Sequence, residues 1–219
     1  MSWPSEIFLS FFYSDSNYTT MLLLSKEDVA KLVTMEETID VVEKAFLAHA
    51  QGKTVYPPKD QFILPEDESR WWGFMPVYVE GMGIACKMVC DYHDNPKKGL
   101  PTIIGTILLA DPDTGQLKAI MDGTYLTAVR TGASGGLAAK YLSREDSKVV
   151  GIIGCGVQAR TQLEALTKVR DIETAKIFDL KEENMDKFIS DMGFLNINIE
   201  KADADSVQDT DIVVAATAS

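Results

Sequence analysis

The sequence predicts an α/β fold, in which a parallel-sheet domain of the Rossmann type follows an N-terminal α/β domain. Two observations support this prediction. The first is an apolar run at residues 149–153 that leads directly into a glycine-rich turn and then a helical pattern. The second is that strand-like and helix-like segments occur on both sides of that turn, which is typical of α/β proteins.

The glycine-rich turn carries a G-x-G-x-x-A pattern at Gly154, Gly156 and Ala159. The first glycine permits a tight turn, the second lets a pyrophosphate approach the backbone, and the small third residue lets the helix pack closely. The helix over residues 158–169 then begins where a phosphate would meet its N-terminal amides. Asp179 ends the next strand, where a carboxylate accepts hydrogen bonds from ribose hydroxyls and repels a 2′-phosphate. The stretch predicts NAD binding; the alternative is a glycine-rich turn without a ligand.

The composition excludes several classes of protein. The chain has 219 residues, 46% of them hydrophobic and 25% charged, as expected for one or two soluble domains. Its net charge of -12 argues against a nucleic-acid partner. No apolar run approaches the roughly 20 residues of a membrane span, so no membrane partner is expected. Three cysteines without a C-x-x-C spacing and two distant histidines predict neither disulfides nor a metal site, and favour the cytoplasm.

Residues 1–20 are predicted to be a disordered extension ahead of a natural start at Met21. They combine two apolar clusters with a polar setting, and they lack the charged leading segment and cleavage site of a signal peptide. The alternative is an arm that packs on a partner subunit.

Residues 21–145 are predicted to form the N-terminal α/β domain. Two capping pairs, Ser25 with Asp28 and Thr34 with Glu37, each open a helix. Strands are predicted at residues 22–24, 61–64, 71–79, 83–89, 102–109 and 117–121. The last two strands flank a turn at residues 111–115 with a glycine in the left-handed position.

A helix over residues 122–142 is rich in small side chains, so we expect it to pack very closely on a neighbour. These small residues are Ala128, Gly132, Ala133, Gly135, Gly136, Ala138 and Ala139.

Residues 146–219 are predicted to form the Rossmann domain. After Asp179, a helix is expected over 182–192 and strands over 197–200 and 211–216. A complete sheet of this type would continue with further helices and strands, so we expect the sequence to be a fragment whose sheet has an exposed edge.

Four cations near predicted strand ends stand out in this acidic chain: Lys59, Arg70, Lys87 and Arg130. Lys87 lies inside an apolar strand, where a charge is unfavourable unless it is paired or its pKa is lowered. The alternative is an edge-strand lysine that reaches water. Arg130 has neighbours too small to cover it, so it either faces a cleft or forms a salt bridge between domains. Lys59 and Arg70 are surface cations or, with the others, surround an anionic substrate.

The cysteines are predicted to be structural. Cys155, within the glycine turn, is expected to be a small filler rather than a nucleophile, and Cys86 and Cys90, four apart in one strand, are expected to lie in the core.

Several motifs together resemble the ornithine cyclodeaminase/mu-crystallin superfamily. They are Gly99-Leu-Pro-Thr, Asp111-Pro-Asp-Thr-Gly, Met121-Asp-Gly-Thr-Tyr-Leu-Thr-Ala-Val-Arg-Thr-Gly-Ala and Ile153-Gly-Cys-Gly-Val-Gln-Ala. The resemblance runs from about residue 21 to residue 219 and is closest to the archaeal-type alanine dehydrogenases.

The resemblance implies that the domain of residues 21–145 binds the substrate and dimerises, and that the active site lies in a cleft between the two domains. It implies that Lys87 is the catalytic acid/base and that Lys59, Arg70, Lys87 and Arg130 bind the substrate. The residues that it implies for NAD contacts are Thr102, Arg130, Gly154, Gly156, Val157, Gln158, Ala159, Asp179, Leu180, Lys181 and Thr217.

The function implied by the resemblance is NAD-dependent oxidative deamination of a small amino acid, L-alanine to pyruvate and ammonia, by a homodimer. Three alternatives remain open. One is an ornithine cyclodeaminase that forms L-proline with catalytic NAD. Another is a ketimine reductase or opine-type dehydrogenase, and the last is a non-catalytic, crystallin-like protein that binds NAD(P)H. The resemblance places the acid/base aspartate of the cyclodeaminases after the last residue of this sequence.

Overall fold

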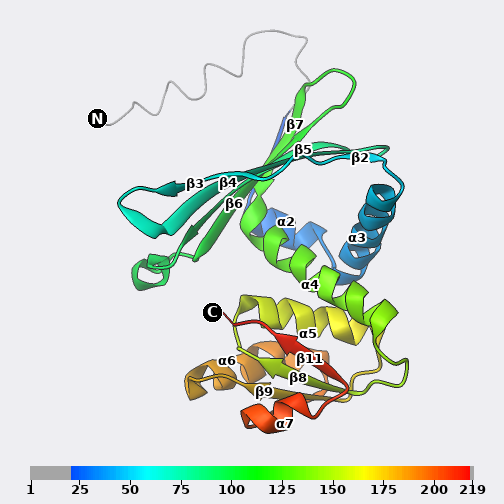
Figure 1. Cartoon of the computed structure of the whole chain (residues 1–219), viewed down its shortest axis with the longest axis vertical. Coiled ribbons are helices and arrows are strands. Elements are labelled where there is room, and N and C mark those ends of the chain that lie inside the picture. Colours follow the sequence, from blue (N-terminus) through cyan, green and yellow to red (C-terminus); the bar gives the residue numbers. More distant parts are fainter. Residues whose placement is uncertain (1–20, 218–219) are drawn as a thin grey trace.

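The computed structural model describes residues 21–217, which form two β-sheets with helices packed between them (Figure 1). The prediction made for residues 1–20 lies outside this range. Helices pack on both sheets, and strands and helices alternate over residues 123–215, so the predicted α/β class is confirmed.

The larger sheet is mostly antiparallel. Its strands are β1 (Leu22–Leu24), β2 (Thr54–Val55), β3 (Asp60–Leu64), β4 (Asp67–Val79), β5 (Gly83–Tyr92), β6 (Ile103–Ala110) and β7 (Leu117–Asp122). They are ordered β1-β7-β6-β5-β4-β2, with β3 also paired to β4. Both β4 and β5 are longer than predicted, because their ladder continues through polar residues to the pair Arg70 and Tyr92.

Three helices lie on one side of the larger sheet: α2 (Lys26–Leu32), α3 (Met35–Ala50) and α4 (Gly123–Leu142) (Figure 1). The predicted caps of the first two are confirmed, because the Ser25 and Thr34 hydroxyls accept hydrogen bonds from the amides of Asp28 and Glu37. The predicted left-handed glycine is confirmed at Gly115, with a φ of 73°.

The smaller sheet is entirely parallel, in the order β10-β9-β8-β11. Its strands are β8 (Val149–Ile153), β9 (Thr174–Phe178), β10 (Asn198–Lys201) and β11 (Ile212–Ala215), and its helices are α5 (Val157–Val169), α6 (Glu182–Met192) and α7 (Ala204–Gln208). The short α7 and the 3-10 turns η1 (Asn95–Lys98) and η2 (Gly193–Leu195) escaped prediction, since they have too few residues for a periodic pattern. Within residues 21–217, no helix is both long and apolar enough to cross a membrane.

Helix α4 packs on α5 at close backbone distance, as its small residues predicted. A Cβ atom added to Gly132 would lie 2.5 Å from the carbonyl oxygen of Thr161, and one added to Gly136 would lie 2.8 Å from the Cβ of Ala165. The earlier residue of α4 contacts the earlier residue of α5, and the later contacts the later, so the two helices run parallel. This contact fixes the larger sheet and its helices against the glycine-rich turn that precedes α5.

Candidate active site

Lys87 lies in β5 on the face of the larger sheet that α4 covers. The ladder between β5 and β6 pairs Lys87 with Ile107 and Val89 with Gly105. Gly105 packs against α4, because a Cβ atom there would lie 3.1 Å from the carbonyl carbon of Gly123. Paired residues and alternate residues of a strand share one face, so Lys87 points toward α4. Because β5 lies between β4 and β6, the alternative of an edge-strand lysine is wrong.

Arg130 projects from α4 toward the same face of the sheet. It follows Gly123 by seven residues, which is about two helical turns, so both lie on the side of α4 that faces the sheet. Arg130 is nevertheless exposed, whereas Gly123 is buried against Gly105. The Arg130 side chain is therefore accessible to solvent, and its charge acts on Lys87.

Lys59, from the segment between β2 and β3, reaches this face across Gly73. A Cβ atom on Gly73 would lie 3.0 Å from the Cε atom of Lys59. The Lys59 ammonium lies 4.0 Å from the centroid of the Trp71 ring, a cation–π distance. Gly73 pairs with Val89 in the ladder, so Lys59 lies on the same side of the sheet as Lys87.

The charges of this cluster act on Lys87. Burial, then the charge of Arg130 and then that of Lys59, lowers the pKa of Lys87 from 10.5 to about 8. The side chain is partly buried. Lys87 therefore exists as both amine and ammonium near neutral pH, beside two fixed cations that would attract an anion.

The structure does not bring Arg70 together with the other three cations. Arg70 pairs with Tyr92, five residues beyond Lys87, so its side chain lies on the opposite face of the sheet. There its guanidinium group forms an ion pair with Asp67 at 2.9 Å, and a longer one with Asp94 at 4.0 Å. The cluster on the α4 side thus consists of Lys59, Lys87 and Arg130.

The glycine-rich turn has the steric features that a dinucleotide requires. Gly154 has a φ of 90°, and a Cβ atom there would lie 2.8 Å from the Ala216 carbonyl oxygen and 3.1 Å from the Thr217 nitrogen. A Cβ atom on Gly156 would have no heavy atom of the described chain within 4 Å, apart from its own neighbours. Ala159 is completely buried. The turn thus has no room for a side chain at Gly154, open space beside Gly156 and tight packing at Ala159.

Asp179 follows β9 and is held beside this turn. One carboxylate oxygen accepts a hydrogen bond from the Cys155 amide at 2.9 Å, and the other accepts from the Lys181 amide and the Asn184 side chain, each at 2.9 Å. Burial acts to raise the pKa of Asp179, but the donors outweigh it and the pKa lies below its usual value. The carboxylate is therefore ionised at neutral pH and fixed in orientation. The adjacent Leu180 is 93% exposed.

The other residues implied for NAD binding lie at several places. Val157 is exposed at the start of α5, and the Gln158 side-chain oxygen is buried without a hydrogen-bond partner among residues 21–217. Thr217 lies beside Gly154. Thr102 precedes β6, and its carbonyl accepts a hydrogen bond from the amide of Tyr92 at 2.9 Å.

Sequence reasoning missed Arg160, one turn into α5. Its guanidinium group donates hydrogen bonds to the carbonyl oxygens of Cys155 and Gly156 in the glycine turn and pairs with Asp191 of α6. The sequence did show an arginine one helical turn after the glycine pattern. It did not show the partner of this arginine, because Asp191 lies 31 residues further along the chain.

The cysteine predictions hold for two of the three residues. Cys155 is buried, as expected for a filler. Burial, followed by the nearby charge of Asp179, raises the pKa of its thiol to about 11, which opposes the thiolate form that a nucleophile needs. Cys90 is buried as predicted, whereas Cys86 is only partly buried.

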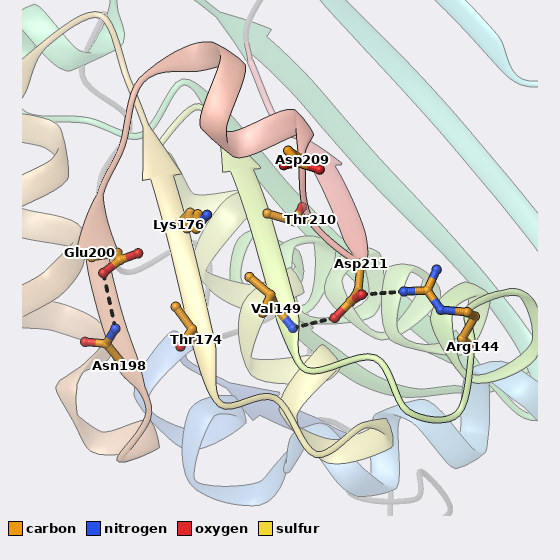
Figure 2. A pocket seen from close by; sticks show the side chains of 9 residues that line it. All are labelled: Arg144, Val149, Thr174, Lys176, Asn198, Glu200, Asp209, Thr210 and Asp211. Carbon is orange, nitrogen blue, oxygen red and sulfur yellow. Dashed lines mark hydrogen bonds and ion pairs between the residues drawn. The ribbon is translucent and has the colours of Figure 1, made fainter.

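A polar hollow of about 640 Å³ lies at the other edge of the smaller sheet (Figure 2). Val149, Thr174 and Asn198, which begin β8, β9 and β10, line it, and an ion pair between Arg144 and Asp211 stands at one side. Ligands of parallel α/β sheets bind outside the carboxyl ends of the strands. This hollow lies at the amino ends, so we do not assign the dinucleotide to it.

Known proteins are similar to this chain in sequence and in fold. The family model of the ornithine cyclodeaminase/mu-crystallin family matches residues 19–219. An alanine dehydrogenase of Archaeoglobus fulgidus is 41% identical over 198 residues, which are 90% of this chain and 60% of the relative.

Two solved structures also match closely. A Delta(1)-pyrroline-2-carboxylate reductase of Thermococcus litoralis, in complex with NADH and L-proline, has a TM-score of 0.86 at 44% identity. The match covers 90% of this chain and 62% of that one. An archaeal alanine dehydrogenase dimer with bound NAD has a TM-score of 0.84 at 41% identity, covering 90% and 60%. The chain therefore spans about 60% of the length of these relatives, and it belongs to the ornithine cyclodeaminase/mu-crystallin family.

Proposed function

We propose that the protein is an NAD-dependent amino-acid dehydrogenase that converts L-alanine to pyruvate and ammonia reversibly. The observation that supports this most is the environment of Lys87, where burial and then the charges of Arg130 and Lys59 lower the pKa to about 8. The 41% identity to an alanine dehydrogenase supports alanine as the substrate.

The cofactor assignment is supported by the steric features of the glycine turn. The open space above Gly156 admits a pyrophosphate, and the ionised Asp179 has the charge and the acceptor atoms to bind the ribose hydroxyls of NAD. Its negative charge opposes a 2′-phosphate. Gln158, in the first turn of α5, is proposed to line the same site. NAD, when bound, supplies the hydride acceptor for the oxidation.

Lys59 and Arg130 are proposed to bind the substrate carboxylate, because both are cations on the α4 side of the sheet near Lys87. The substrate ammonium group first loses one proton to solvent, and removal of the hydride from Cα then leaves an iminium ion. The neutral amine of Lys87 accepts a proton from the water that attacks the iminium carbon, which gives a neutral carbinolamine. The resulting Lys87 ammonium returns this proton to the nitrogen, ammonia leaves, and the hydroxyl proton goes to solvent as the keto group forms. The reverse reaction uses the same proton transfers in the opposite order. Arg70 is left out of this set because it lies on the opposite face.

We also propose that residues 21–145 and 146–219 are separate domains, each with its own sheet. A homodimer formed through the larger sheet is supported by exposed apolar side chains on its strands, among them Leu22, Leu23 and Phe62. One of the solved relatives is a dimer. Three free cysteines favour a reducing compartment, which we propose is the cytoplasm.

A second candidate is a reductase of cyclic imines with a carboxylate group. The specific observation in its favour is the 44% identity to a Delta(1)-pyrroline-2-carboxylate reductase. The same cations would bind the carboxylate, and the ammonium form of Lys87 would donate the proton that the imine nitrogen needs.

The test compares the two substrates with one cofactor. Purified protein and NADH are mixed with pyruvate plus ammonium, or with Delta(1)-pyrroline-2-carboxylate, and absorbance of the reduced cofactor is followed. Oxidation that needs both pyruvate and ammonium supports the dehydrogenase, and faster oxidation with the cyclic imine supports the second candidate. Lys87→Met should abolish either activity, while Lys44→Met, which removes an exposed lysine of α3, should retain it. Lack of NADH binding would overturn both.

A further inference from the structure

The Arg160 side chain is held by partners on both sides. On one side a single terminal nitrogen donates to the carbonyl oxygen of Cys155 and, at 3.0 Å, to that of Gly156. On the other side the Nε atom lies 3.1 Å from a carboxylate oxygen of Asp191, and the second terminal nitrogen lies 3.0 Å from the same oxygen. The guanidinium group also lies 5.1 Å from the centroid of the buried Phe188 ring. Arg160 therefore bridges the glycine turn and α6.

These contacts help to fix where the amides of the turn point, together with the backbone amide of Arg160, which also donates to the Gly156 carbonyl oxygen at 3.4 Å. In a planar trans peptide the carbonyl oxygen and the amide hydrogen point in opposite directions. When Arg160 binds the carbonyl oxygen of Cys155, the amide of Gly156 must point away from Arg160. The carbonyl oxygen of Gly156 and the amide of Val157 are related in the same way.

The two amides open helix α5, and the space above Gly156 is free of described atoms. No side chain among residues 21–217 caps this helix end. Amides at the start of a helix bind phosphate groups, and they do so best when their orientation is fixed in advance.

We propose that Arg160 is a positioning residue for the dinucleotide: it orients the amides of Gly156 and Val157 toward the pyrophosphate, and Asp191 holds it in place. The inference rests on the proposed binding of NAD and adds the device that keeps the turn in its binding shape. Asp191 also neutralises the guanidinium charge, so Arg160 acts through the backbone rather than as a direct phosphate ligand.

If Arg160 had a purely structural role, its substitution would weaken the binding of all ligands equally. A positioning role predicts that only ligands with a pyrophosphate bind more weakly. NADH and ADP-ribose contain the pyrophosphate, and adenosine does not. Adenosine still presents its ribose to Asp179, whose carboxylate is bound by other donors in the turn and in α6.

The experiment measures the dissociation constants of NADH, ADP-ribose and adenosine by calorimetry for the unmodified protein and for Arg160→Gln, Arg160→Lys and Asp191→Asn. Thermal unfolding is recorded for each. Lys187→Gln is the matched control, because it removes one positive charge from an exposed position of α6 one turn before Asp191.

For Arg160→Gln we expect NADH and ADP-ribose to bind roughly tenfold more weakly, since hydrogen bonds to charged groups have about this effect on affinity. Adenosine should bind within about twofold of the unmodified protein. Arg160→Lys and Asp191→Asn should give smaller losses in the same two ligands, and Lys187→Gln should give none. Equal losses for all three ligands, or no loss, would overturn the inference. If the unmodified protein fails to bind NADH, the proposed function itself is wrong.

Discussion

Replacement of Lys87 by methionine should stabilise the protein while abolishing its activity. The pKa of Lys87 is lowered from 10.5 to about 8, first by burial and then by the charges of Arg130 and Lys59. At roughly 1.4 kcal/mol per pKa unit, this difference corresponds to roughly 3 kcal/mol by which folding disfavours the ammonium form. Solvent and ionic screening reduce the figure, so we expect Lys87→Met to raise the free energy of unfolding at pH 7 by about 1–2 kcal/mol.

The sign of the pH dependence follows from the two pKa values. The folded-state pKa of Lys87 lies below its ordinary value, so the unfolded protein binds more protons between pH 8 and pH 10.5. The unfavourable contribution of Lys87 is complete below pH 8 and disappears as the pH rises toward 10.5. The advantage of Lys87→Met should therefore shrink across this range.

The assay is thermal unfolding of both proteins at pH 7 and pH 10. For a chain of this size, a gain of 1–2 kcal/mol corresponds to an increase in Tm of about 3–6 °C. Lys44→Met, at an exposed position, should leave Tm unchanged within about one degree. An unchanged or lower Tm for Lys87→Met at pH 7, or an increase that persists undiminished at pH 10, would refute the claim that the fold disfavours the ammonium form of Lys87.

Three further predictions concern the cofactor, the pH dependence of the reaction and the packing of α4 on α5. Asp179→Ser should weaken NADH binding about tenfold and improve NADPH binding, as measured by calorimetry; an unchanged preference would contradict the ribose role. The rate of oxidative deamination should rise with pH through about 8, as Lys87 loses its proton, and Arg130→Gln should move that midpoint to higher pH because it removes a neighbouring charge. Gly132→Ala should destabilise the fold by about 1–3 kcal/mol in chemical denaturation, because the added methyl group would lie 2.5 Å from a backbone oxygen of α5. Gly193→Ala is its control, since nothing lies within 4 Å of that position, and equal effects of the two substitutions would refute the packing argument.

The glycine turn could be predicted from the sequence because its demands are local. Gly154 and Gly156 differ in what surrounds them, but both roles follow from a strand that turns into a helix within a few residues. The same holds for the caps of α2 and α3, where donor and acceptor are three residues apart. The small residues of α4 also predicted close packing, although they did not identify α5 as the neighbour.

The position of Arg70 could not be predicted, because it depends on strand register. A shift of one residue moves a side chain to the other face of a sheet, and the run around Trp71 and Trp72 shows no alternation that would set the face. The role of Arg160 was hidden for a related reason. Its contacts combine a turn five residues back with Asp191 on another helix, and only the folded chain brings these together.

The most direct test of the central claim follows the hydride itself. Protein is incubated with NADH deuterated at the transferable position, together with pyruvate and ammonium or with the cyclic imine, and the amino-acid product is examined by mass spectrometry. The account predicts a single deuterium at Cα of alanine or proline, formed by the unmodified protein and by Lys44→Met but not by Lys87→Met. NADH that binds while neither substrate yields a labelled product, or labelling that survives in Lys87→Met, would contradict it.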